Sequence, residues 1–226
     1  MKTSQSWSTN NLNPLGPVKH LLSHLSLRVR QDQLKIMIST LKPNKKTRVL
    51  DVGISPNEEL VDTNYFEKNY PFPEKITAVS IEDCSNLKKE YPQIKILKIK
   101  PNQKLPFKDN QFDLVVSWAT LEHVGDYQDQ AYFLKELSRV GQKIFVTTPY
   151  RGSPYEPHTG IPFLQWLPLP LFRKVCSLLG KEFWTTPKNL NPLWLKDVKN
   201  MLSSRINIRV YKTFGFVPSH LIISSK

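Results

Sequence analysis

The short segment VLDVG at residues 49–53 has the form of a turn that holds a nucleotide-like ligand. An apolar run contains Asp51 and ends at Gly53, and a residue without a side chain lets the backbone approach such a ligand closely. Glu82 follows the next apolar run, where a carboxylate can accept hydrogen bonds from two ribose hydroxyls. Residues 54–56, Ile-Ser-Pro, stand where further glycines are usual. They predict a stiff turn that binds its ligand weakly.

A second group of reactive side chains lies in the segment TTPYRGSPYEPHTGIPFLQWLP, at residues 147–168. Carboxylate and imidazole groups can take a proton from a hydroxyl group, so we predict catalytic roles for Glu156 and His158, with Tyr150 beside them. The alternative for His158 is a hydrogen bond that only fixes the loop. A guanidinium can clamp an acidic group and aromatic rings can form an apolar wall. The predicted substrate-binding residues are Arg151, Tyr155 and Trp166.

Several short apolar runs predict the scaffold for these groups. Two of them, residues 49–53 and 112–118, are almost entirely apolar, as strands buried on both faces are. Strand-like and helix-like stretches alternate, which favours a parallel sheet covered by helices, with ligands bound at the carboxyl ends of the strands. The predicted strands lie within residues 47–53, 75–81, 94–99, 112–119 and 143–149, and two more lie within 206–226.

Two amphipathic helices accompany these strands. At residues 30–41, Leu34, Met37, Ile38 and Leu41 recur at helical spacing and should pack on the sheet. A second helix is predicted at 127–141, with its glycine at 141 as the C-terminal stop.

The chain reads as a loose leader at 1–17 followed by a single domain at 18–226. From about 150 to 192 the alternation breaks down, and many of the 18 prolines lie there. We expect an insertion held by rigid turns, because loops of this length in compact domains are usually functional. Its apolar stretch at 161–172 suits a lid or a core segment, and peripheral membrane contact is the third alternative.

The formal charge of +13 and the pI near 9.7 suit contact with nucleic acid or an anionic membrane, but also a merely solvated lysine-rich surface, which we favour. No apolar signal segment or membrane span is evident, and a cytoplasmic protein is expected. Cys84 and Cys176 are far apart and in no metal or redox spacing, so neither a disulfide nor a metal site is predicted.

The segments LPFKDNQFDLVVSWATLEHVGD, at 105–126, and YFLKELSRVGQKIFVTTP, at 132–149, follow VLDVG at a suitable distance. Together they resemble the class I S-adenosylmethionine-dependent methyltransferases over about residues 45–150. The segment after 147 resembles an insertion found in a subset of that family. The resemblance implies an α/β, Rossmann-like, seven-stranded, mostly parallel sheet of order 3-2-1-4-5-7-6, with helices on both faces and the cofactor S-adenosyl-L-methionine.

Carried over by position, the resemblance assigns cofactor contacts to the ends of the first and fourth strands, and Glu82 after the second strand and Asn102 after the third are the expected substitutes for the family's usual acids. The implied residues are Asp51, Gly53, Glu82, Asn102, Trp118, Ala119 and His123. The chain departs from the family pattern at its single loop glycine, at Ser80, where the ribose acid usually stands, and at Pro101, where an acid usually precedes Leu-Pro-Phe. Glu82 has the same strand parity as Ser80 and is the expected substitute.

The resulting prediction is an enzyme that transfers a methyl group from S-adenosylmethionine to oxygen or nitrogen of a small molecule. A sugar, a glycolipid precursor or another anionic metabolite fits the residues of the insertion. The departures from the family pattern leave a non-catalytic binding or scaffold protein as the first alternative. The basic charge leaves an RNA methyltransferase as the second.

Overall fold

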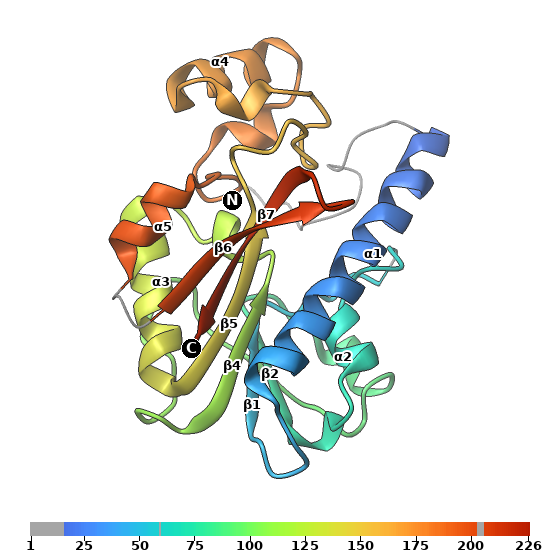
Figure 1. Ribbon diagram of the computed structural model, residues 1–226, viewed down its shortest axis with the longest axis vertical. Helices are drawn as coiled ribbons and strands as arrows, with labels where there is room; N and C mark the ends of the chain where they lie inside the picture. The colour runs from blue at the N-terminus through green and yellow to red at the C-terminus, as the bar shows by residue number, and fades with distance from the viewer. Residues whose placement is uncertain (1–15, 59, 203–205) are drawn as a thin grey trace.

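A computed structural model describes residues 16–58, 60–202 and 206–226, with side chains described from residue 24 onward. Its centre is a seven-stranded sheet of order β3-β2-β1-β4-β5-β7-β6 (Figure 1). Neighbouring strands from β3 to β5 are parallel, and β7 is antiparallel to both β5 and β6. The strands are β1 (Val49–Val52), β2 (Ile76–Ser80), β3 (Lys95–Lys98), β4 (Phe112–Trp118), β5 (Gly141–Pro149), β6 (Ile206–Thr213) and β7 (Val217–Ser225).

Helices cover both faces of this sheet (Figure 1). The α-helices are α1 (Gly16–Leu41), α2 (Tyr65–Asn69), α3 (Tyr127–Val140), α4 (Leu169–Leu178) and α5 (Leu195–Met201). Short 3-10 turns lie at η2 (Pro73–Lys75), η3 (Ser85–Lys88), η4 (Leu121–His123), η5 (Leu164–Trp166) and η6 (Glu182–Thr185). The fold class and the strand order predicted from the sequence are confirmed.

Alternating side chains of the central strands build one core on each face. Val116 of β4 packs in the cluster that contains Met37 of α1 and Phe66 of α2. Its neighbour Val115 packs on the opposite face with Leu134 of α3. The continuous apolar run of β4 is therefore explained by burial on both sides, because successive strand residues point to opposite faces.

The first helix is longer than its apolar stripe predicted. It begins at Gly16 rather than near residue 30, because no proline or glycine interrupts residues 18–41. The predicted stripe is confirmed, since Leu34, Met37 and Leu41 are buried and Ile38 is partly buried. Most of the predicted leader at 1–17 lies outside the described residues.

Gly141 is the C-cap at which α3 ends, as the sequence predicted, but not in the left-handed conformation usual for a glycine there. Its backbone is extended, with φ −111°, and it is the first residue of β5. A β carbon at this position would lie 2.4 Å from Cγ2 of Val115. The glycine is required by the close approach of β5 to β4, which the local sequence pattern does not show.

The insertion after β5 lies above the carboxyl ends of the parallel strands, at the top of Figure 1, and has a small apolar core of its own. Phe163 and Trp166 remain about half exposed, at 52% and 46%. The core cluster consists of Leu164, Phe172, Cys176, Trp184 and Leu190. Within the described part of the chain, no helix is both long and apolar enough to cross a membrane.

Candidate functional site

A cavity of about 610 Å³ opens at the carboxyl ends of β1 and β4. Its wall is completed by α1, by the segment between β1 and α2, by the insertion and by the turn between β6 and β7. Parallel α/β sheets bind ligands at this edge, and the volume lies in the range of small-molecule sites. The functional groups of the cavity come from each of these elements.

Two buried carboxyl groups face the cavity near the end of β1. Asp51 and Glu67 are 3% and 5% exposed, and the two carboxyl groups hydrogen-bond to each other. Burial, and then the neighbouring Glu67 carboxylate, raise the pKa of Asp51 well above its usual range, and burial also raises the pKa of Glu67. Oδ1 of Asp51 and Oε1 of Glu67 are buried without a hydrogen-bond partner. This end of the cavity is therefore suited to a cationic ligand group.

The loop after β1 is fixed by side chains rather than by repeated glycines. Gly53 has φ +116°, and a β carbon there would lie 2.0 Å from Oγ1 of Thr120. Ile54 is buried in the core, and the amide of Asn64 bonds to both N and O of Ser55. The stiff loop predicted from residues 54–56 is thus anchored from both sides.

The end of β4 carries a strained residue beside an aromatic stack. Ala119 has φ +50°, a conformation that costs a non-glycine residue about 1–3 kcal/mol. Trp118 stacks on Phe66, with ring centroids 5.6 Å apart, and its Nε1 is buried without a hydrogen-bond partner. Both residues line the cavity, as the sequence predicted for the cofactor side.

Glu122 and His123 follow on η4, and both line the cavity. Glu122 is 1% exposed, and its Oε2 accepts a hydrogen bond of 2.8 Å from Oγ1 of Thr148. Nδ1 of His123 donates to the carbonyl oxygen of Asn189 at 2.6 Å. Burial, reinforced by nearby His158, lowers the pKa of His123 to about 3, so its ring is neutral near pH 7.

The insertion is tied to this segment by buried amide groups. Asn191 donates its backbone N–H to the carbonyl oxygen of Glu122 at 2.8 Å. Nε2 of Gln130 on α3 donates to the carbonyl oxygens of Leu121 and Asn191. These contacts position the insertion against η4 and hold its reactive residues over the cavity.

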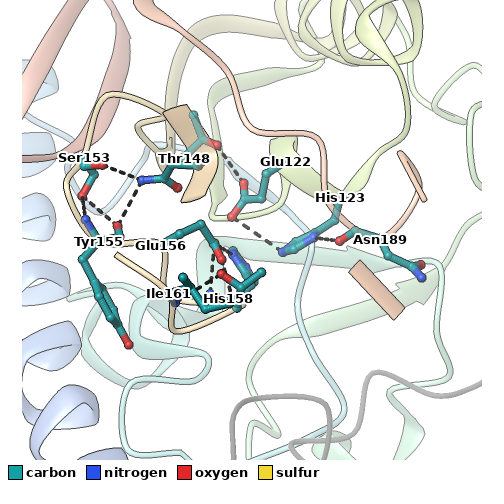
Figure 2. Close-up of polar contacts among 11 residues, drawn as sticks. Glu122, His123, Thr148, Ser153, Tyr155, Glu156, His158, Ile161 and Asn189 are labelled. Atoms are coloured by element: carbon teal, nitrogen blue, oxygen red, sulfur yellow. Dashed lines mark hydrogen bonds and ion pairs between the residues drawn. The ribbon is translucent and has the colours of Figure 1, made fainter. Parts of the chain in front are cut away.

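Glu156 and His158 form a buried pair at the insertion end of the cavity (Figure 2). Nδ1 of His158 lies 2.6 Å from Oε1 of Glu156, and the backbone N–H groups of His158 and Thr159 donate to the same carboxylate. Burial works against the imidazolium, but the Glu156 carboxylate outweighs it and raises the pKa of His158. His158 lines the cavity, and Glu156 orients it from behind.

Tyr150 and Arg151 face away from this cavity. Tyr150 lines a separate shallow pocket beside Trp194. Arg151 is buried, and it donates through Nε to the carbonyl oxygen of Gln165 and through Nη2 to that of Leu167. Its guanidinium also lies 5.3 Å from the ring centre of Trp194. Arg151 therefore joins segments of the insertion. It does not line the cavity, so the sequence-based prediction that it binds an acidic group of the substrate there is wrong.

The other residues predicted from the sequence divide into two groups. Tyr155 lines the cavity. Trp166 instead donates its Nε1 to the carbonyl oxygen of Ser153 at 2.8 Å, and it is not among the residues that line the cavity. Glu82 and Asn102, expected at the ribose, are not among them either.

The cavity also has ionisable residues that were not predicted, among them Arg30, Glu67, Glu122 and His220. Arg30 of α1 lines the wall near Glu122 and His158, and its Nη1 is buried without a hydrogen-bond partner. Glu67 and His220 line it as well. His220 interrupts the apolar strand β7 and was the one sequence signal available, since buried strands rarely carry a histidine without a reason.

Comparisons with known proteins agree with this geometry. Residues 50–143 match the family model described as a methyltransferase domain. No curated protein matches the chain.

Solved structures with the same fold include S-adenosylmethionine-dependent methyltransferases from three organisms. The protein from Aquifex aeolicus has 17% identity and a TM-score of 0.54, and the match covers 94% of this chain and 100% of that chain. The protein from Methanosarcina mazei has 16% identity and a TM-score of 0.51, with coverage of 81% and 94%. The protein from Thermotoga maritima has 15% identity and a TM-score of 0.53, with coverage of 91% for both chains.

The matched segment runs from β1 to the start of β5, and it includes the strand ends of β1 and β4 that line the cavity, together with η4. Residues 50–143, less than half of the chain, thus match a methyltransferase domain, and the chain shares its fold with solved S-adenosylmethionine-dependent methyltransferases.

Proposed function

We propose that the protein transfers a methyl group from S-adenosylmethionine to an oxygen or nitrogen atom of a small anionic acceptor. The observation that carries this proposal is that a single cavity joins Asp51 and Trp118, at the strand ends, to His158 of the insertion. One enclosed space thus offers a site for a donor and, beside it, groups that can act on an acceptor.

The residues at the strand ends fit this cofactor. Asp51 and Glu67 present unpartnered carboxyl oxygens, and Trp118 presents an unpartnered indole N–H. S-adenosylmethionine carries positive charge on its sulfonium and ammonium groups, and the sulfonium supplies a methyl group that is already activated for transfer. Buried carboxyl groups favour a cation at this position, and the indole N–H can satisfy an acceptor atom. Asp51, Glu67 and Trp118 are therefore the proposed donor-binding residues.

At the acceptor end we assign the activating role to His158. Because the donor is already activated, orientation of the acceptor supplies most of the rate, and assistance in losing a proton matters chiefly for a hydroxyl acceptor. Glu156 holds the His158 ring through Nδ1 and leaves Nε2 for the cavity side. Glu156 is thus a positioning residue, and Tyr155 forms part of the acceptor wall.

Arg30 indicates the class of acceptor. It is the one arginine or lysine among the described residues that line the cavity, and its buried Nη1 has no hydrogen-bond partner. A buried guanidinium is stabilised by a carboxylate or phosphate group, which it can bind through two nitrogens. We therefore propose an acceptor that carries a carboxylate or phosphate group. Arg30 then has the substrate-binding role that the sequence analysis assigned to Arg151.

Calorimetric titration of the purified protein with S-adenosylmethionine and with its demethylated product tests the donor half of the proposal. We expect binding to both, and a loss of about tenfold in affinity for Asp51→Asn, because the amide cannot ionise beside a bound cationic group as the carboxyl group can. Thr213→Ser, a conservative change at another residue that lines the cavity, serves as the matched control. No binding of either ligand at millimolar concentration would favour the scaffold alternative.

A second experiment addresses turnover. The protein is incubated with methyl-labelled S-adenosylmethionine and a small-molecule extract fractionated by anion exchange. Mass spectrometry should detect label in an anionic product with the wild-type protein, and a much smaller amount with His158→Gln. Label found only in neutral or cationic products would refute the assignment of Arg30.

A further inference from the structure

The side chains of Glu122, His123 and His158 converge on one point of the cavity wall (Figure 2). Each offers a potential metal-binding atom, and these atoms lie within 4.8 Å of one another. Oε1 of Glu122 is 3.7 Å from Nε2 of His123, and the two imidazole rings meet edge to face with centroids 4.8 Å apart. Two ligand atoms of a tetrahedral ion with bonds of about 2.1 Å lie about 3.4 Å apart. The Glu122 and His123 atoms are already close to that separation, and the potential ligand atom of His158 lies within 4.8 Å of both.

The second nitrogen of each ring is held by an outer hydrogen bond. A carbonyl oxygen only accepts, so the bond to Asn189 places the proton of His123 on Nδ1. The bond to the Glu156 carboxylate does the same for His158. When either ring is neutral, its lone pair is therefore on Nε2. Metal-binding histidines are oriented in this way, by a backbone carbonyl or a carboxylate on the other nitrogen.

Glu122 completes the arrangement from the same cavity wall. Thr148 donates to its Oε2, whereas its Oε1 is buried without a hydrogen-bond partner. A buried carboxylate oxygen in this state costs free energy unless it meets a cation or a donor.

We propose that Glu122, His123 and His158 bind one divalent transition-metal ion, such as Zn²⁺, Mn²⁺ or Fe²⁺, at the acceptor end of the cavity. Imidazole nitrogens with one carboxylate suit these ions, whereas Mg²⁺ and Ca²⁺ prefer sites made of oxygen atoms. The sequence predicted no metal site, because its ligands come from η4 and from the insertion, which the fold brings together.

This inference rests on the proposed function and specifies how His158 activates the acceptor. Three protein ligands leave coordination positions open, as in catalytic metal sites. An acceptor hydroxyl bound there becomes more acidic and releases its proton to water. Its oxygen then forms the new bond to the methyl carbon, while the carbon–sulfur bond breaks and its electron pair stays on sulfur. The Arg30 guanidinium near Glu122 can hold the anionic group of the same acceptor.

The test measures metal binding without any acceptor. The protein is stripped with a chelator, and Zn²⁺ affinity is measured by competition with a chromophoric chelator, with Mn²⁺ titrated in parallel. We expect one ion per chain, and a loss of affinity of at least tenfold for Glu122→Gln and for His158→Gln. Glu67→Gln, which makes the same chemical change in a buried carboxyl of this cavity, should stay within about threefold of the wild type.

An outer-shell variant keeps the test decisive if a ligand variant fails to fold. Glu156→Gln keeps all three ligands, and it should weaken binding about 10- to 100-fold, as removal of such partners does in metal sites. Binding of less than one ion per ten chains at micromolar metal would overturn the inference, and so would unchanged affinity in Glu122→Gln. Titration of the stripped protein with S-adenosylmethionine separates the two proposals, since donor binding survives if only the metal inference fails.

Discussion

Gly53 and Thr120 approach each other so closely that a β carbon on Gly53 would lie 2.0 Å from Oγ1 of Thr120. The contact joins the loop after β1 to the segment after β4, the two strand ends that frame the donor end of the cavity. The loop glycine therefore has a packing role in the protein itself, in addition to any contact with a ligand.

The first prediction concerns this contact. Gly53→Ala should lower the free energy of unfolding by about 2–4 kcal/mol, because a side chain at φ +116° is strained and also overpacks against Thr120. The measurement is urea unfolding. Adding Thr120→Ala should recover the overpacking part and leave the backbone strain. No recovery in the double variant, or no loss in the single one, would contradict the packing role.

A second prediction concerns the buried carboxyl group of Asp51. Its pKa is raised by burial and by Glu67, so the protonated form is the one that favours the folded state. This contribution is present below the unfolded pKa of 3.8 and is lost as the pH rises through the higher folded pKa. Asp51→Asn cannot ionise, so it does not lose this contribution to stability as the pH rises. Its stability relative to the wild type should therefore increase between pH 4 and pH 8 in denaturant titrations, and a constant difference would be the contrary result.

The third prediction separates two placements of the ribose. Because Glu82 is not among the cavity-lining residues, Glu82→Ala should change the affinity for S-adenosylmethionine by less than about twofold in calorimetry. A tenfold loss would instead place the ribose at the end of β2, as the sequence pattern predicted. Glu90→Ala, at an exposed acid further along the chain, is the control for a general charge effect.

Arg30 leads to a fourth prediction, in which stability and binding change in opposite directions. Arg30→Met removes a buried guanidinium nitrogen that has no hydrogen-bond partner, and should raise the free energy of unfolding by about 1–3 kcal/mol. The same variant should lose affinity for an anionic acceptor. Arg28→Met, at an exposed residue of the same helix, should do neither. Thermal unfolding with and without acceptor measures both effects. A less stable Arg30→Met protein would contradict the prediction that the unpartnered guanidinium nitrogen of Arg30 destabilises the fold.

The fifth prediction concerns pH and His220. Burial, followed by the charges of Arg30 and His158, lowers the pKa of His220 to about 3, and the ring of Tyr211 on β6 also lies against it. The unfolded chain takes up a proton near pH 6.5, well before the folded protein does. The free energy of unfolding should therefore fall as the pH drops below about 6.5, by at most about 1.4 kcal/mol per pH unit from this group. His220→Asn should show a shallower fall between pH 6 and pH 4, and an unchanged slope would be the contrary result.

Much of the fold could be predicted from the sequence because the signals are local. The continuous apolar run of β4 indicates burial on both faces, and the spacing of Leu34 and Met37 indicates one buried helix face. Such patterns can be recognised because apolar residues recur at a fixed spacing within a single strand or helix. Gly141 shows the limit of such signals. The helix does end there, as predicted, but a glycine is needed because Val115 of another strand leaves no room for a side chain.

The sequence by itself determined the alternation of strands and helices and the segments that carry reactive groups, and its family resemblance implied the sheet order. The tertiary structure decided which of those groups meet. The Arg151 side chain bonds within the insertion, and Arg30 is the arginine that lines the cavity. The tertiary structure also brought Glu122 and His123 of η4 against His158, far along the chain. Contacts of this kind depend on how separate elements pack, and no spacing within one segment records them.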